Sequence, residues 1–306
     1  MTTISTSTSA FFERASLNIA DLRKRAEDLQ SQMSSGDRFA NSSENPVSAS
    51  RLRTLSRADS LSSVDKTNAN RANADLSLTD ATLSSFTDYI SRTLELATQA
   101  ANGTLTNAQR SSIGVELSHL HGDLVVLANS RDSAGHALFG GETGGDAYTL
   151  DGSGNAVYIG TASAGELPIG DGQTVNRGLT GPEFLNFDVN GVPTNLMAVV
   201  KGLADALQGG SPDPAGAASD ALAALHKGLE SVTTGQTLVG ARLNWIDITL
   251  SRQENLGELR ADEQSQIGST DLAGTIAQLQ QAMLVLEASQ ASFAKLAGLS
   301  LFDLLR

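Results

Sequence analysis

The histidines are the residues of this chain that could act as metal ligands or proton-transfer groups. His119 and His121 form an H-x-H pair in a segment with helical periodicity. Side chains two residues apart on a helix point to different faces, so we expect no shared metal ion between them. His136 and His226 are isolated, and no serine occupies a G-x-S-x-G turn. These patterns favour solvated or packing histidines over a hydrolytic site.

Two further motifs could indicate a ligand site, and both have a simpler structural interpretation. The segment GSGNAV at 152–157 contains G-x-G but lacks the third glycine and the following helix of a dinucleotide site, so a turn explains it. Trp245, in RLNWID, is interpreted as a packing residue of a long helix instead of a ligand-stacking residue. We therefore assign no catalytic, cofactor-binding or metal-binding residue, and predict that the chain is not an enzyme. A hydrolase or nucleotide-binding enzyme is the alternative from another class.

Composition narrows the possible partners and locations. Because 34 acidic residues oppose 21 Lys and Arg, the net charge of −13 repels phosphate backbones, and we expect no nucleic acid partner. The absence of cysteine excludes disulfides and thiolate chemistry. The N-terminus MTTISTSTSAFFERA lacks the features of a Sec signal peptide, and no apolar run reaches the ~18 residues of a membrane span. We expect no membrane insertion, and any secretion by another route.

The N-terminal region predicts three helices with narrow apolar seams. Apolar residues of the first helix recur alternately at spacings of three and four, which is typical of a coiled-coil heptad. This first seam consists of Phe12, Ala15, Ile19, Leu22, Ala26, Leu29 and Met33. The helix is expected to end at Gly36, and Asn45 and Pro46 suit the start of a second helix that closes near Gly103.

A third helix follows a short turn. Thr106 and Gln109 have the spacing of a capping box, in which each residue satisfies a free amide of the other. The apolar residues that follow have the same alternating spacing and are Ile113, Leu117, Leu120, Leu124 and Leu127. Helices joined by short turns pack as hairpins, so these seams must bundle together or coil against other chains.

The middle of the chain changes pattern. From about 140 to 192, short apolar runs such as AVYIG, ELPIG and FLNFDV are separated by glycine-rich turns. They predict brief strands of a small β module inserted between two helical halves. Aromatic residues make up only 4% of the chain, which favours thin helical layers over a thick globular core.

The C-terminal region returns to helix. One helix is expected from about 222 to 266, a length of ~65 Å. Its seam is Leu222, Leu225, Leu229, Val232, Gln236, Val239, Leu243, Ile246 and Leu250. After Gly268, the residues STD offer new caps for a last helix. The last seam is Leu272, Ile276, Leu279, Met283, Leu286, Gln290 and Phe293.

The predicted fold class is therefore mainly α. Long antiparallel helical hairpins or a coiled coil are built from both termini, and a small β-rich domain is inserted between them. The expected domain boundaries are 1–139 for the N-terminal helical region, 140–192 for the β-rich domain and 193–306 for the C-terminal helical region.

Several motifs, in order along the chain, resemble the flagellin superfamily. The segment at 32–52, QMSSGDRFANSSENPVSASRL, is similar to the family signature of Ser-Ser-Gly, a basic residue and a later Pro-Val, in the form found at the hook–filament junction. It differs at Asn45, where the family frequently has Asp. LELATQAANGTLTNAQRSSI at 94–113 resembles the Glu-Leu-Ala-x-Gln-Ala block of the family, and ALFGG at 137–141 resembles the passage into an outer domain. RLNWID at 242–247 and LEASQASFAKLAGLSLFDLL at 286–305 resemble the C-terminal helices of the family.

This resemblance implies a structural adapter of the bacterial flagellum. The terminal helical regions would form an axial layer, and the β-rich domain would face outward. The implied partners are further copies of the chain in a ring of about eleven, another hook-associated protein, flagellin, and a cytoplasmic export chaperone. The resemblance also implies type III export, unfolded, to an extracellular flagellum. The alternative within the family is a short flagellin that forms the filament itself.

The resemblance places the self-assembly interface on the terminal seams. The residues expected in it are Phe12, Ile19, Leu22, Leu29, Met33, Leu272, Ile276, Leu279, Met283, Leu286 and Phe293. Apolar knobs at heptad spacing need holes on a facing helix, and the implied axial layer supplies such helices from neighbouring copies.

Overall fold

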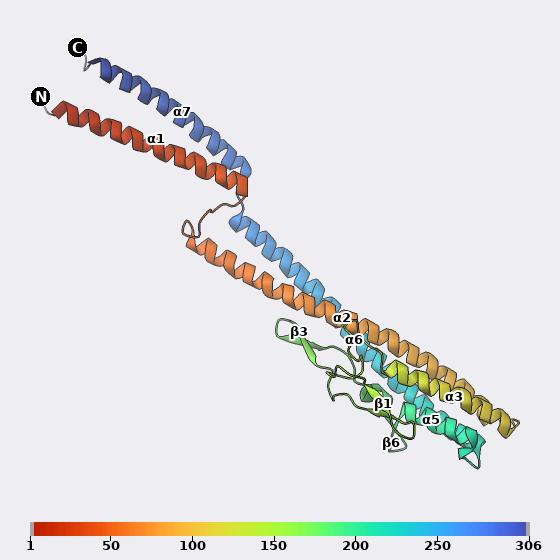
Figure 1. Cartoon of the computed structure of the whole chain (residues 1–306). Coiled ribbons are helices and arrows are strands. Elements are labelled where there is room, and N and C mark those ends of the chain that lie inside the picture. The colour runs from red at the N-terminus through yellow and green to blue at the C-terminus, as the bar shows by residue number, and fades with distance from the viewer. Residues whose placement is uncertain (1–2, 304–306) are drawn as a thin grey trace. The chain divides into compact units, whose positions relative to one another are not determined.

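Long helices dominate the structure, a computed structural model that describes residues 3–303. The five long helices in this range are α1 (Thr3–Ser35), α2 (Pro46–Ala101), α3 (Asn107–Ala128), α6 (Pro214–Gly268) and α7 (Leu272–Asp303) (Figure 1). The chain forms two compact units, one of residues up to Ser60 and from Leu256, and one of residues 61–255. Helices α2 and α6 contribute residues to both units. The predicted mainly α class is confirmed.

The ends of the helices are set by local capping interactions, as the sequence predicted. Helix α1 stops before Gly36, whose φ of 76° an L-residue rarely adopts. The Asn45 side chain accepts the Ser48 amide at 3.1 Å at the start of α2. Thr106 and Gln109 form the reciprocal capping box of α3, with backbone-to-side-chain distances of 2.9 and 3.3 Å.

The inserted region contains small hairpins instead of one sheet. In residues 3–303, six strands pair as three antiparallel two-stranded hairpins. The strands are β1 (Tyr148–Leu150), β2 (Ala156–Tyr158), β3 (Glu166–Gly170), β4 (Gln173–Asn176), β5 (Asn186–Val189) and β6 (Val192–Asn195). Isolated hairpins are marginally stable in water, so each depends on the helices beside it.

Two elements near the end of this region were not predicted. Strand β6 pairs with β5 from Val189↔Val192 to Asn186↔Asn195, through an Asn190-Gly191 turn with both φ positive. Its segment VPTN contains proline and a single apolar residue, so it has little strand character in sequence. The short helix α4 (Gly181–Leu185) is capped by Glu183, whose carboxylate accepts from the Thr180 backbone and hydroxyl.

The predicted domains are consecutive segments of the chain, with boundaries at 139/140 and 192/193. The two compact units are defined by spatial contacts instead, and the first of them combines both ends of the chain. Helix α3 already ends at Ala128, and the chain up to Tyr148 is organised by Asn129. The Asn129 side-chain Oδ1 accepts hydrogen bonds from the Ala147 and Tyr148 backbone amides at 2.9 and 2.8 Å. Its Nδ2 donates to the Tyr148 carbonyl at 2.9 Å. The division into 1–139, 140–192 and 193–306 stays a prediction.

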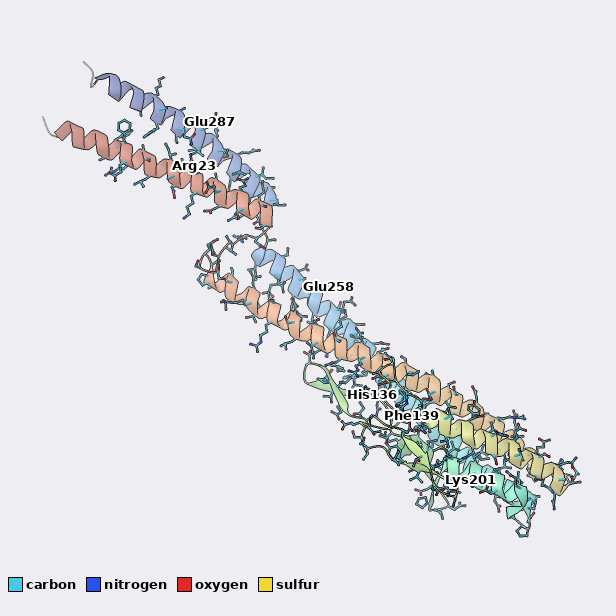
Figure 2. All side chains as sticks on the ribbon, in the orientation of Figure 1. Arg23, His136, Phe139, Lys201, Glu258 and Glu287 are labelled. Atoms are coloured by element: carbon cyan, nitrogen blue, oxygen red, sulfur yellow. The ribbon has the colours of Figure 1, made fainter. Side chains whose placement is uncertain are left out.

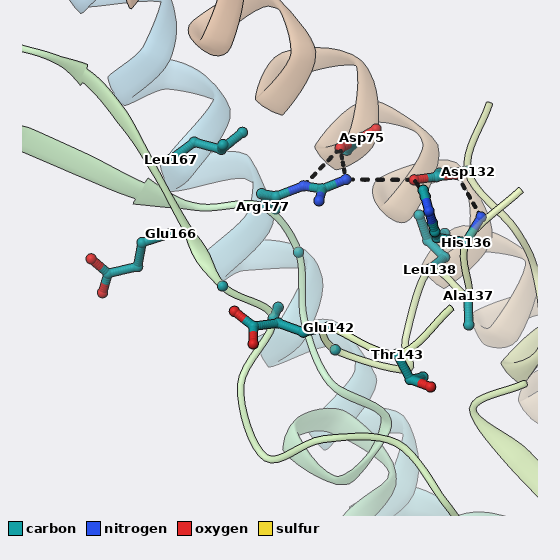
Figure 3. Close-up of a pocket in the computed structure, with 14 residues that line it drawn as sticks. Asp75, Asp132, His136, Ala137, Leu138, Glu142, Thr143, Glu166, Leu167 and Arg177 are labelled. Carbon is teal, nitrogen blue, oxygen red and sulfur yellow. Dashed lines mark hydrogen bonds and ion pairs between the residues drawn. The ribbon is translucent and has the colours of Figure 1, made fainter. Parts of the chain in front are cut away.

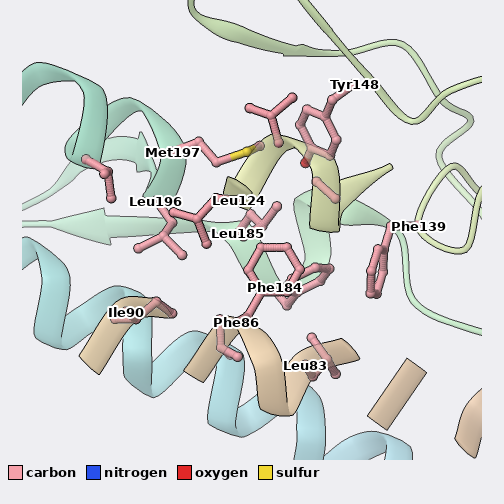
Figure 4. Close-up of a cluster of buried hydrophobic side chains, with 14 of the residues drawn as sticks. Leu83, Phe86, Ile90, Leu124, Phe139, Tyr148, Phe184, Leu185, Leu196 and Met197 are labelled. Carbon is pink, nitrogen blue, oxygen red and sulfur yellow. The ribbon is translucent and has the colours of Figure 1, made fainter. Parts of the chain in front are cut away.

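The core of the second unit is centred on three phenylalanines from three segments. Phe86 of α2, Phe139 and Phe184 of α4 are fully buried, with ring centroids 4.8 to 6.1 Å apart in tilted and edge-to-face geometry (Figure 4). Such pairs add about 0.5–1.5 kcal/mol each beyond burial of their area. Leu196 at the start of α5 (Leu196–Asp205) joins this core, and the π-helical turn Ala206–Gly210 follows α5. The few aromatic residues of the chain therefore fasten the insert to the helices.

Two glycines of α6 allow the insert to approach the helix closely. A Cβ atom on Gly228 would lie 2.5 Å from the Leu196 Cδ1, and one on Gly235 would lie 3.1 Å from the Phe184 Cβ. Glycine in a helix costs about 1 kcal/mol relative to alanine, so its presence at both contact points reflects packing. Gly240 of the same helix has nothing within 4 Å of such a Cβ.

Alanine substitutions at these glycines should therefore have opposite effects. We expect Gly228→Ala to lower the free energy of unfolding by about 1–3 kcal/mol through overpacking. Gly240→Ala should raise it by up to about 1 kcal/mol through helix propensity. Urea denaturation followed by circular dichroism measures both. Equal shifts of the same sign would contradict the close packing at Gly228.

Candidate self-assembly surface

Helices α1 and α7 lie side by side and antiparallel in the first unit (Figure 1). Ala26 and Leu29 of α1 are buried with Ala282 of α7, and Leu279 packs against them. Farther along the pair, Phe12 and Phe293 meet edge to face with ring centroids 5.6 Å apart. One stripe of each helix is thus covered within the chain.

The structure separates the eleven predicted interface residues into two groups. Seven are buried or half-buried, and these are Phe12, Ile19, Leu22, Leu29, Leu279, Leu286 and Phe293. The other four are exposed, namely Met33 at 36%, Leu272 at 52%, Ile276 at 43% and Met283 at 54%. The predicted α7 seam therefore combines residues from two neighbouring faces of the helix. One face packs on α1, and the other is exposed to solvent in the single chain. That either stripe contacts other copies stays a prediction.

Further exposed apolar residues of this pair were missed by the seam analysis. On α7, Leu284 is 68% exposed, and Val285 and Leu296 are 42% and 44% exposed. On α1, Phe11 and Leu17 are 52% and 64% exposed. Leu284 and Val285 fall between the heptad positions, so a search for one stripe could not find them.

Scarcity of charge is the sequence signal that would have found them. The charged residues of the 32-residue α7 are Glu287, Lys295 and Asp303, whereas α1 carries four acidic and four basic residues in 33. Figure 2 labels one charged residue of each helix, Glu287 on α7 and Arg23 on α1. A helix that is apolar on most of its circumference is normally enclosed on several sides. Helix α1 covers one of them.

The loops that follow α1 and α6 are joined by backbone hydrogen bonds. The Arg38 amide donates to the Gly268 carbonyl at 2.7 Å, and the Thr270 amide donates to the Gly36 carbonyl at 2.8 Å. Between them, Asp37 and Ser269 form an antiparallel bridge. The 32–52 motif thus supplies Gly36, Asp37 and Arg38 to a short antiparallel backbone pairing with residues 268–270, which we call the clasp.

Ion pairs set the register of α2 and α6 next to this clasp. Arg51 donates to both carboxylate oxygens of Glu263, at 2.5 and 2.8 Å, which raises the pKa of Arg51 and lowers that of Glu263. Arg260 donates to Asp59 at 2.6 Å, and this bond holds the pKa of Asp59 below its usual range. The Arg51–Glu263 pair is solvent-exposed and the Arg260–Asp59 pair is half-buried, so the first specifies alignment more than it adds stability.

The four histidines do not form a catalytic or metal-binding group. His119 is exposed and His121 is buried on another face of α3, as their spacing predicted, and His226 is exposed. Among the described residues, no cluster of three or more His, Asp or Glu side chains could hold a metal ion. His136 lies 3.4 Å from Asp132 in a charged network.

This network connects the insert to α2 beside a cavity of about 350 Å³ (Figure 3). Arg177 lies 3.1 Å from the Asp75 carboxylate and 3.5 Å from that of Asp132. Burial raises the pKa of Asp132, but hydrogen bonds from the His136 and Ala134 amides and the His136 side chain outweigh this effect and hold it below its usual range. Every charged group has a partner, so the network is suited to fixing the insert in place.

His121 gives the second unit a specific dependence on pH. Burial, followed by the positive charge of Lys201, lowers the pKa of His121, and no described residue hydrogen-bonds to its Nε2. Below the unfolded-state pKa of about 6.5, the unfolded chain binds a proton that the folded chain resists, so stability falls as pH drops.

We expect His121→Leu to weaken this dependence between pH 7.5 and 5.5. The thermal midpoint of the parent should fall by about 2–4 °C for each kcal/mol lost, and that of the variant by less. His119→Leu, at an exposed position, is the control and should behave as the parent does. If both variants keep the parental slope, His121 does not carry the effect.

Comparison with known proteins agrees with the arrangement of the terminal helices. Residues 4–143 match the family model of the bacterial flagellin N-terminal helical region. This part of the chain, which contains helices α1 to α3, is therefore similar to the N-terminal helices of flagellins. Flagellar hook-associated protein 3 of Escherichia coli K12 is 29% identical over 293 residues, which cover 89% of this chain and 90% of that protein. Its counterpart in Salmonella typhimurium is 28% identical over 317 residues, 98% and 99% of the two chains.

A solved structure shares the fold. The flagellar junction protein of Legionella pneumophila superposes with a TM-score of 0.59 at 15% identity, over 71% of this chain and 99% of that one. Within the described residues, none of the helices combines the length and apolarity that a membrane span requires.

Substitution on the exposed stripe of α7 tests whether it is an interface. Met283→Asp should leave the free chain folded, because the side chain is 54% exposed. In a ring it should bury an unpaired carboxylate, at a cost of about 3–5 kcal/mol per copy. We expect an exported chain that does not remain on flagella, measured by immunoblotting of the flagellar and medium fractions.

The matched control is Met283→Leu, which keeps an apolar side chain of similar volume and should behave as the parent does. Normal retention of the Asp variant on flagella would show that this stripe stays in solvent.

Proposed function

We propose that this chain is a structural adapter that joins hook-side proteins to the flagellin filament by self-assembly into a ring. The names of its relatives, which are flagellar hook-associated and junction proteins, support this role. The observation that carries it is α7, whose Leu272, Ile276, Met283 and Leu284 remain exposed although α1 covers another side of the helix.

Neighbouring copies would cover this apolar surface. Full burial of an exposed side chain of this size contributes about 1.5–3 kcal/mol, and these four are 43–68% exposed, so each would stabilise a contact by roughly half of that before the entropy of association is subtracted. Identical copies around an axis repeat the contact at every step, and about eleven copies close the ring. A single chain in water leaves these side chains exposed, so association lowers its free energy.

The two compact units suit different positions in such a ring. We assign α1 and α7 to an axial layer, and the hairpins of residues 140–192 to an outward-facing domain, with 1–139 and 193–306 as the axial regions. The partners are further copies, another hook-associated protein on the hook side and flagellin on the filament side. A cytoplasmic chaperone would precede export, and the absence of cysteine suits passage as an unfolded chain.

A structural role without cofactor fits the side chains available for chemistry. Arg177, Asp75, Asp132 and His136 are paired with one another, and the four histidines are dispersed over the chain. A short flagellin that forms the filament itself is the second candidate. The relatives named above favour the adapter over it.

Deletion of the gene tests the adapter role. Electron microscopy should show hooks without filaments, and immunoblotting should detect unassembled flagellin in the medium. A plasmid copy should restore filaments. Filaments at parental number would contradict the proposal, and hooks without any secreted flagellin would favour the short-flagellin alternative.

A further inference from the structure

Helix α6 carries a second apolar stripe that the chain itself does not cover. Its core-facing residues Val232, Val239, Ile246 and Gln253 are buried at intervals of seven. On another side of the same helix, Leu238 and Trp245 are each 43% exposed and Ile248 is 57% exposed. With Thr234 and Ala241 they follow alternate spacings of four and three, and we call these five residues the outer α6 stripe. This spacing suits packing against another helix.

The central part of the outer α6 stripe is free of charge, whereas the exposed Asp247 and Arg252 lie near its last residue, Ile248. From 231 to 246, the single charged residue is Arg242, which is half-buried and donates to the Gly178 carbonyl at 2.7 Å. The exposed neighbours are uncharged residues such as Thr237 and Asn244. Charged residues are depleted from the centres of protein interfaces because their desolvation is costly. In a chain with a net charge of −13, this stretch and residues 272–286 of α7 are both nearly or entirely without charge.

Trp245 lies in the middle of this stripe. It is the single tryptophan of the chain, and the packing role assigned from sequence does not account for its 43% exposure. Tryptophan is enriched among the residues that dominate binding energy at interface centres. Its place between Leu238 and Ile248 gives the stripe a large apolar centre with smaller residues on both sides.

We infer that the outer α6 stripe is a lateral contact with a second copy of this chain, an inference that rests on the proposed ring. Every copy carries the same charge of −13, so two copies repel over most of their surfaces and approach most easily through an uncharged one. A closed ring uses a contact in which one face of a copy meets a different face of the next. The stripe belongs to residues 61–255 and is separate from the contacts assigned to α1 and α7.

Photo-crosslinking in cells tests this contact. The crosslinking amino acid p-benzoylphenylalanine replaces Trp245 or Ile248 in the full chain, expressed as the sole copy. Irradiation of hook-attached protein should give an adduct of the chain with itself at both positions. The control position is Thr233, which is exposed on α6 but lies outside the stripe, and it should give at least five-fold less of this adduct.

A fourth crosslinking position, Leu284 of α7, distinguishes failure of the lateral contact from failure of the proposed ring, because it tests self-assembly through α7. A chain–chain adduct from Leu284 without one from Trp245 or Ile248 would overturn the lateral contact and leave the ring intact. The absence of chain–chain adducts from all positions would overturn the ring itself. Adducts from the stripe to a different protein alone would show that its occupant is not a second copy.

A charge substitution gives an independent readout. Ile248→Glu places a carboxylate on the stripe, and Thr233→Glu places one outside it. Both side chains are exposed, so thermal midpoints close to the parent should confirm folding in each case. We expect a loss of at least ten-fold in filament-bearing cells for Ile248→Glu and parental numbers for Thr233→Glu. Parental numbers in both strains would contradict the contact.

Discussion

Helix α7 has more apolar surface than one partner helix can cover. Its 32 residues include three charges, and α1 covers the side that carries Leu279 and Ala282 while Met283 and Leu284 remain in solvent. Water does not solvate such a surface favourably, and α1 is the helix that packs along α7. This uncovered apolar surface is what supports the proposed packing of the first unit against neighbouring copies.

In the second unit, by contrast, the hydrophobic core is completed by residues of the same chain. Its hairpins are too small to be stable alone, and they depend on a core built around Phe86, Phe139 and Phe184. Gly228 and Gly235 bring this core against α6, and Arg177 ties the insert to Asp75 of α2. The result is a unit whose interior is complete within one chain. It can present a fixed surface while the terminal helices associate.

The features predicted correctly from sequence were those with local causes. The caps at Asn45 and Thr106 depend on side chains within three residues of the amides they bond, so spacing alone revealed them. Strand β6 was missed because VPTN is held by its partner strand and by an Asn-Gly turn. The predicted α7 seam combined residues of two different stripes, because a one-dimensional period could not separate Leu279, which faces α1, from Met283, which does not. Trp245 was assigned to packing from sequence, and the structure leaves 43% of it exposed.

The central claim is that neighbouring copies cover the exposed side of α7. The chain lacks cysteine, so Met283→Cys provides a single reporter thiol. Its rate of maleimide labelling can be compared between the free chain and hook-attached protein, with Val126→Cys, at a 73% exposed position of the second unit, as a reference. We predict rapid labelling in the free chain and at least ten-fold slower labelling after assembly. Equal rates in both states would contradict the account.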